Sequence, residues 1–216
     1  MPLQSQHAVS FLIETLMRSP GEIVIAALGP LTNLAVALIQ QPEICTKIQS
    51  LVVMGGAITH GNITPSAEFN FYVDPHAAHV VLTSGIPITL ITLDLTHQAI
   101  ATPERLAPIA QLNTPVGNTV INLLTHYSRH DMTTYGFAGA PLHDPCVIAY
   151  LLDPTLFTTR FVHIAVETQG ETTIGRTIAD MWKLTNQPPN VNLAESMNVD
   201  GFYQLLQRSL ATYSNP

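Results

Sequence analysis

Residues 23–42 read IVIAALGPLTNLAVALIQQP and contain no charged side chain. The stretch is long and apolar enough for a membrane span, but Gly29, Pro30, Thr32 and Asn33 interrupt it near the centre. The β-branched residues before the interruption are typical of a buried strand, and the spacing after it is typical of a helix. The stretch therefore predicts a strand, a turn and a helix.

The same alternation continues along the chain. Further apolar, β-branched runs read SLVVMGG, PITLITLDL and FVHIAVE, and we expect all of them in one mostly parallel sheet. Residues 185–202 predict a loop and a short strand. Helical spacing is found at about 6–18, 31–40, 75–84, 103–111, 115–128, 145–152 and 200–212. Alternating strands and helices predict an α/β fold with a layered, doubly wound sheet.

Composition narrows the class of protein. The chain has 216 residues, 46% hydrophobic and 11% charged, which predicts one domain over 1–216 and apolar contacts between subunits of a homo-oligomer. Acidic residues outnumber basic ones by 15 to 8 without a basic cluster, so we expect no nucleic-acid partner. Two cysteines give no disulfide framework, and no signal peptide or membrane span is recognised; we expect a cytoplasmic protein.

Polar residues follow the predicted strands, where ligands bind in sheets of this kind. Glu68 and Asn70 lie two positions apart, and on an extended segment both would point to one side. A carboxylate beside an amide can hold sugar hydroxyl groups, and Asn62 could join them. A polar loop that merely contains these residues also accounts for the pattern, so the spacing leaves both interpretations open.

Asp74, Asp144 and Asp153 are each followed by proline. The first two precede helical runs, which is typical of a helix N-cap with proline at the first helical position. Asp144 is also preceded by His143, whose side chain titrates near neutrality and could donate a proton to a leaving group. His143 could equally be a surface or core residue. No zinc-protease, P-loop or dinucleotide motif is present in the sequence.

Five ordered motifs resemble those of the nucleoside hydrolases. They are ALGPLTNLA (27–35), VVMGGA (52–57), GNITPSAEFNFYVDPHAA (61–78), LDLTHQA (93–99) and LHDPCVIAYLLDP (142–154). The resemblance implies an N-glycosidase that hydrolyses ribonucleosides to ribose and free base with a bound calcium ion. The transition state would have ribosyl-cation character, as in glycosidases generally.

The resemblance also implies residue roles. His143 matches the acid that protonates the leaving base, and Tyr135 falls where the family contacts that base. Asp144 and the backbone carbonyl of Leu28 match two calcium ligands. The ribose would be bound by Met54, Asn62, Glu68 and Asn70. The segment YGFAGAPLHDP looks most like pyrimidine-preferring members, which implies uridine and cytidine as substrates.

The chain departs from the family pattern in one respect. The family begins with a strand ending in an aspartate cluster, DxDxxxDD, which supplies further calcium ligands and the general base, and these residues contain no such cluster. We expect an N-terminally truncated chain covering the C-terminal two thirds of the fold, with an incomplete calcium ligand set, inactive alone and prone to aggregation. The alternatives are a non-catalytic nucleoside-binding or interaction module and a truncated gene product.

Overall fold

The computed structural model describes residues 4–213, without the side chains of His130 and Asp131. The chain forms two compact units. Unit 1 comprises Met1–Asp94 and Thr159–Ala194, and unit 2 comprises Leu95–Thr158 and Glu195–Pro216. The single domain expected over 1–216 stays a prediction.

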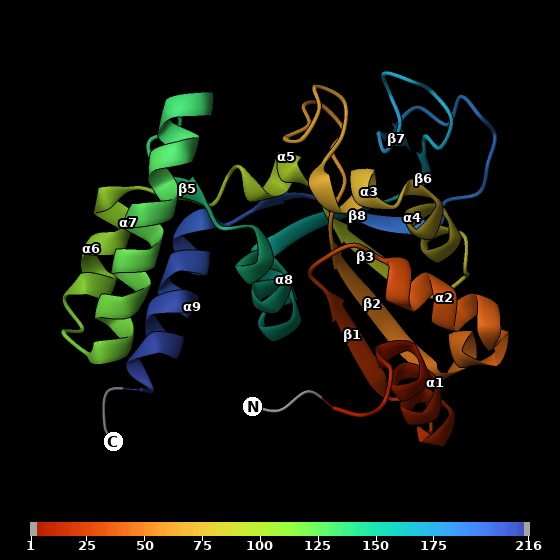
Figure 1. Ribbon diagram of the computed structural model, residues 1–216. Helices are drawn as coiled ribbons and strands as arrows, with labels where there is room; N and C mark the ends of the chain where they lie inside the picture. The colour runs from red at the N-terminus through yellow and green to blue at the C-terminus, as the bar shows by residue number, and fades with distance from the viewer. Residues whose placement is uncertain (1–3, 214–216) are drawn as a thin grey trace. The chain divides into compact units, whose positions relative to one another are not determined.

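The central sheet has six strands in the order β1-β2-β3-β8-β6-β7 (Figure 1). Their bounds are β1 (Ile23–Ala27), β2 (Ile48–Met54), β3 (Ile88–Ile91), β8 (Val191–Met197), β6 (Phe157–Val166) and β7 (Thr177–Asp180). The pairs β1–β2, β2–β3 and β3–β8 are parallel, which confirms the predicted α/β class with a mainly parallel sheet. The short strand expected within 185–202 is β8, an inner strand of the sheet.

The prediction for FVHIAVE was partly wrong. This run lies in β6, within the sheet, but β6 pairs antiparallel with β7, a strand that the sequence did not reveal. Only residues 167–176 separate β6 from β7. A parallel pair needs a longer crossover between its strands, so a connection this short permits only the antiparallel arrangement.

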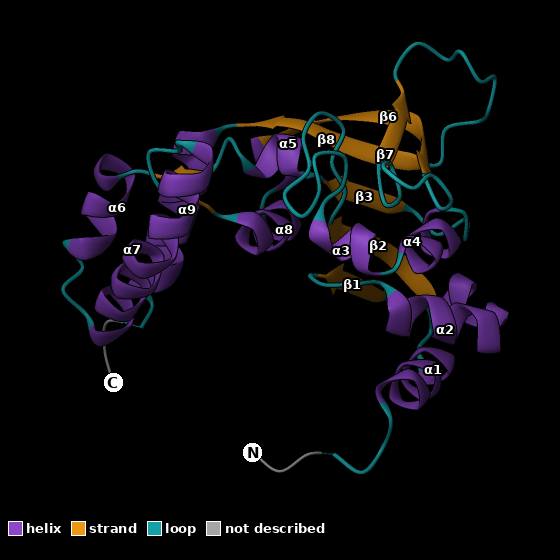
Figure 2. Ribbon diagram, turned by 45° about the horizontal axis from the view of Figure 1, so that its top comes forward, coloured by secondary structure: helices purple, strands orange, loops and turns teal. Residues whose placement is uncertain are grey.

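Helices of unit 1 cover one face of its sheet, as Figure 2 shows for α2 and α4. They are α1 (Ala8–Arg18), α2 (Thr32–Gln40), α3 (Phe69–Val73) and α4 (Pro75–Leu82), with the 3-10 helix η1 (Pro42–Lys47) before β2. Alternate residues of the strands, such as Leu51 and Val53 in β2 and Leu90 in β3, are buried in one core with Leu38 and Val81 of the helices. The period of two in a strand therefore directs every second side chain into this core.

Unit 2 is mainly helical. Its elements are α6 (Pro103–Ala110), α7 (Pro115–Tyr135), α8 (His143–Leu152), α9 (Val199–Ala211), the 3-10 helix η2 (Pro154–Leu156) and the strands β4 (Ile100–Ala101) and β5 (Ala140–Pro141). Helices α6, α7 and α9 pack against one another (Figure 1). Helix α7 runs beyond the predicted residue 128 and ends at Gly136, whose φ of 70° is left-handed. No helix within residues 4–213 is long and apolar enough to cross a membrane.

The helix cap expected at Asp74 is confirmed. The Asp74 carboxylate accepts from the Ala77 amide at 3.0 Å at the start of α4, and Asp153 caps η2 in the same way. The expectation for Asp144 was wrong, because α8 begins at His143 after an N-cap at Leu142 that makes no side-chain hydrogen bond. Leu142 donates its amide to Ala99 beside the β4–β5 pair, so the chain enters the helix before the Asp-Pro step.

Candidate functional site

The candidate residues are distributed over both units. Unit 1 contains Leu28, Met54, Asn62, Glu68 and Asn70, and unit 2 contains Tyr135, His143 and Asp144.

Glu68 is the N-cap of the short helix α3. Its side chain is 2% exposed, and its carboxylate accepts from the amides of Gly56 (2.9 Å), Asn70 (2.8 Å) and Phe71 (3.1 Å). The extended segment expected over Glu68 and Asn70 is not found, because the chain turns into α3 directly after Glu68. The carboxylate thus joins the end of β2 to the first turn of α3.

Asn62, Asn70 and Met54 lie around the same turn. The Asn62 side-chain oxygen accepts from the Phe69 amide at 2.9 Å, so Asn62 and Glu68 together satisfy the first amides of α3. The Asn70 side-chain nitrogen donates to the Met54 carbonyl at 3.1 Å and lies 3.7 Å from the Met54 sulfur. The structure therefore brings together four of the five candidates in unit 1 at the carboxyl end of β2.

Asp94 forms hydrogen bonds with the loop that contains Asn62. Asp94 was not identified as a candidate residue from the sequence. Its carboxylate accepts from the Ile58 amide (2.8 Å) and from the Thr59 amide (3.1 Å) and hydroxyl. Burial alone would raise the pKa of Asp94, but these hydrogen bonds outweigh it and lower the pKa below its ordinary value. Its place in LDLTHQA, directly after β3, was the signal that could have found it.

The residues present do not fit a calcium ion. Calcium takes about 6 to 8 oxygen ligands, whereas the described residues contain no group of three or more His, Cys, Asp or Glu that could hold a metal. Leu28 directly follows β1 with a 39% exposed side chain. Asp144 is exposed in the first turn of α8, although nearby protein atoms still raise the pKa of its carboxyl by desolvation. The carboxylates of Glu68 and Asp94 are already bonded to backbone amides.

His143 begins α8 with a partly buried imidazole. Its Nδ1 atom lies 2.8 Å from the hydroxyl oxygen of Thr96, a residue that is 0% exposed. Desolvation by burial, and then the nearby charge of His97, lower the pKa of His143 to about 4. The ring is therefore neutral at pH 7, and one of its nitrogens is fixed against a hydroxyl.

A series of ring contacts extends from this histidine. The His97 ring lies 5.9 Å from the His143 ring and meets Phe137 edge-on at 5.0 Å, while Phe137 lies 5.6 Å from Tyr135. Tyr135 is 42% exposed at the end of α7. Sequence reasoning assigned no role to Thr96, His97 or Phe137, although all three stand in the motifs that it quoted.

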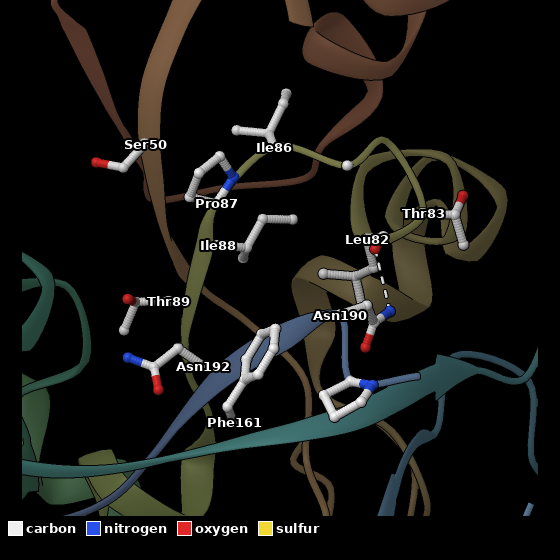
Figure 3. Close-up of a pocket in the computed structure, with 12 residues that line it drawn as sticks. Ser50, Leu82, Thr83, Ile86, Pro87, Ile88, Thr89, Phe161, Asn190 and Asn192 are labelled. Atoms are coloured by element: carbon white, nitrogen blue, oxygen red, sulfur yellow. Dashed lines mark hydrogen bonds between the residues drawn. The ribbon is translucent and has the colours of Figure 1, made fainter. Parts of the chain in front are cut away.

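Two cavities of unit 1 lie away from these residues. One of about 510 Å³ is found at the amino ends of β3 and β8, where Phe161 and Asn192 line it (Figure 3). Its Asn190 side chain donates to the Leu82 carbonyl at 3.1 Å and is thus part of the packing between elements. The other, of about 610 Å³, lies beside the exposed side of α3. None of the candidate residues lines either cavity.

Comparisons of the sequence and of the fold with known proteins both match nucleoside hydrolases. The sequence model described as inosine-uridine preferring nucleoside hydrolase matches residues 1–204. The pyrimidine-specific ribonucleoside hydrolase RihA of Shewanella sp. (strain MR-7) is 43% identical over 98% of this chain and 67% of its own length. An uncharacterised protein of Schizosaccharomyces pombe is 44% identical over 93% of this chain and 65% of its own length.

A solved structure, the purine-preferring ribonucleoside hydrolase from Gardnerella vaginalis, superposes with a TM-score of 0.88 at 33% identity. It covers 99% of this chain, which in turn covers 68% of it. Fold and sequence thus define the same class, the nucleoside hydrolases. The chain belongs to the inosine-uridine preferring nucleoside hydrolase family, and it spans about two thirds of the length of the relatives that it matches.

Proposed function

We propose that this chain belongs to a ribonucleoside hydrolase that cleaves the N-glycosidic bond of uridine and cytidine. The chain would contribute the residues that act on the leaving base. The observation that carries the proposal is the His143 imidazole, which is held by Thr96 and flanked by His97 within an aromatic cluster. A departing pyrimidine needs a proton, and a positioned histidine supplies one after it has itself taken up a proton from solvent. The pyrimidine preference is supported by relatives named as pyrimidine-specific.

The remaining residues have proposed binding roles. Tyr135 and Phe137 would contact the flat face of the base, since aromatic rings stack on such surfaces. Met54, Asn62, Glu68 and Asn70 would line the ribose, with Glu68 and Asn62 acting by fixing α3. The oligomeric state and the cytoplasmic location stay predictions.

Calcium has no part in the proposed steps, because the described residues do not form a donor set that fits the ion. Activation of the attacking water also needs a base, and the resemblance assigns that role to an aspartate cluster, DxDxxxDD, that these residues do not contain. We therefore propose that residues 1–216 alone do not hydrolyse ribonucleosides at an enzyme's rate. Release of uracil from uridine, followed by chromatography with added calcium, tests this, with Shewanella RihA as the active control. Turnover comparable to that of RihA would contradict it.

Hydrolysis itself is tested by complementation. The segment of Shewanella RihA that this chain does not match would be supplied, fused or as a separate polypeptide, and uridine hydrolysis measured. We expect activity, and we expect His143→Ala to lower it far more for uridine than for a nitrophenyl riboside, whose leaving group needs no proton. Equal losses on both substrates would show that His143 binds the substrate and does not protonate its base.

A non-catalytic nucleoside-binding module is the second candidate. It is favoured by the absence of a metal-binding group among the described residues. Calorimetry with uridine separates the two, because a binding module would bind uridine without calcium and release no uracil even after complementation.

A further inference from the structure

Thr96 is the residue that contacts the inner nitrogen of His143. It ends the short helix α5 (Leu93–Thr96), 47 residues before His143 in the sequence, and its hydroxyl oxygen lies 2.8 Å from Nδ1. The side chain of Thr96 is 0% exposed, so solvent does not compete for this contact. A buried hydrogen bond of this kind fixes both the orientation of a ring and the place of its proton.

The neighbouring rings restrain His143 differently. His97 approaches as a tilted ring with centroids 5.9 Å apart, and Phe137 contacts His97 rather than His143. These contacts limit rotation of the imidazole, but they do not distinguish its two nitrogens. The distinction between Nδ1 and Nε2 therefore depends on the Thr96 hydroxyl.

The chemistry of proton donation decides which way this hydrogen bond runs. The neutral imidazole first takes up a proton from solvent at Nε2. When the charged imidazole then gives this proton to a leaving base, the N–H bond at Nε2 breaks, an N–H bond forms on the base, and the ring is left neutral with its other proton on Nδ1. A hydroxyl that accepts from Nδ1–H stabilises this product ring. A hydroxyl that donated to Nδ1 would compete with it.

We propose that Thr96 is a positioning residue whose hydroxyl accepts from Nδ1–H of His143, which leaves Nε2 as the ring nitrogen that can act on the leaving base. This inference rests on the proposed role of His143 as the proton donor. It predicts that the neutral ring has the Nδ1–H form, which is the less stable form of a free imidazole.

Two other histidines of the chain serve as internal references. The His163 Nδ1 lies 3.0 Å from the Pro188 carbonyl, an acceptor, so His163 must carry its proton on Nδ1. The His7 Nδ1 accepts from the Val9 amide at 3.2 Å, so the neutral His7 ring carries its proton on Nε2. We expect His143 to match His163 and to differ from His7.

The test is a long-range proton–nitrogen NMR spectrum of the whole ¹⁵N-labelled chain at pH 7, with His143 assigned by its loss in His143→Gln. The expected result is one Nδ1–H form for His143. Thr96→Val, which keeps the shape but removes the hydroxyl, should shift His143 toward the Nε2–H form, and Thr96→Ser should restore it. The His7 and His163 signals should not change in either variant.

An Nε2–H form of His143 in the unmodified chain would overturn the proposal. A His143 signal in Thr96→Val identical to that of the unmodified chain would also overturn it. If Thr96→Val does not fold, the unmodified chain and Thr96→Ser still decide, because both must show Nδ1–H. The spectrum requires no turnover, so its result is independent of the uridine assays. An Nε2–H form of His143 would contradict the role of Thr96 but not the proposed hydrolysis. Failure to hydrolyse uridine after complementation would contradict the proposed function but not the tautomer result.

Discussion

At the scale of single residues, Glu68 shows how a buried carboxylate organises backbone. It is 2% exposed and accepts from three amides that belong to the end of β2 and to α3. An ionised carboxylate has two acceptor oxygens, whereas glutamine has one oxygen and an amide that itself donates. Replacement would therefore leave a buried amide without its acceptor.

Glu68→Gln should lower the free energy of unfolding by about 3 kcal/mol, because hydrogen bonds to a charged group and a buried unpaired amide each contribute about 1 to 3 kcal/mol. Urea denaturation followed by circular dichroism measures this. Glu22→Gln is the matched control, since Glu22 is exposed, and it should change stability by less than about 0.5 kcal/mol. Equal small effects would mean that the carboxylate charge is not needed at α3.

At the scale of elements, the turn after β2 depends on glycine. Gly56 has a φ of 76°, and a Cβ atom there would lie 2.3 Å from the Thr177 hydroxyl and 3.2 Å from the Phe71 ring. Gly85 has a similar φ of 81° but nothing within 4 Å of its Cβ position. The two positions therefore share the backbone strain and differ in the clash.

Gly85→Ala should cost about 1 kcal/mol from the left-handed backbone alone, and Gly56→Ala should cost more, about 3 kcal/mol, from strain plus overpacking. The difference between the two unfolding free energies measures the clash. Equal costs would indicate that Thr177 and Phe71 move aside without penalty.

The Asp94 carboxylate accepts hydrogen bonds from the first amides of the loop 58–67, and the stability that these bonds contribute should depend on pH. The pKa of Asp94 is lowered in the folded chain, so its contribution to stability is present above about pH 4, the ordinary aspartate value, and is lost as the pH falls through the lower folded pKa. Asp94→Asn should be less stable than the unmodified chain at pH 7. This difference should shrink below about pH 4.

Hydrogen exchange of the Ile58 and Thr59 amides at several pH values measures the same effect locally, because both donate to Asp94. Protection should fall in Asp94→Asn relative to the unmodified chain at pH 7. A difference between the two proteins that stays constant from pH 7 to pH 3 would exclude the carboxylate charge as its cause.

At the scale of the whole molecule, the distribution of carboxylates predicts the response to calcium. A site with a dissociation constant near 10 µM would add about 2.7 kcal/mol at 1 mM calcium, equivalent to a rise of several degrees in melting temperature. The described residues offer no such site. The melting temperature of this chain should therefore be unchanged by 1 mM calcium chloride, with magnesium chloride as the control for ionic strength. A rise specific to calcium would reveal a ligand set that the present fold does not suggest.

The parts of the fold that could be predicted are those with a clear periodic pattern of apolar residues. The period of the apolar residues located β1, β2 and β3 and most helices, because Leu51 and Val53 must reach one core from a strand. Strand β7 was missed because its four residues show no long apolar run. The start of α3 was predicted to be extended because the sequence around Glu68 and Asn70 shows no helical pattern. The helical turn is stabilised by hydrogen bonds that the Glu68 carboxylate accepts from the Gly56 and Phe71 amides.

The sequence by itself determined the family, the alternation of strands and helices, and the candidate residues, since these depend on residue types and spacings within short stretches. Only the tertiary structure decided what those residues contact. It turned Glu68 and Asn62 into caps of α3, moved the start of α8 ahead of Asp144, and paired His143 with Thr96, 47 residues away. Such partners are fixed by packing, because contacts between residues far apart in the chain form only when the elements that carry them share a core.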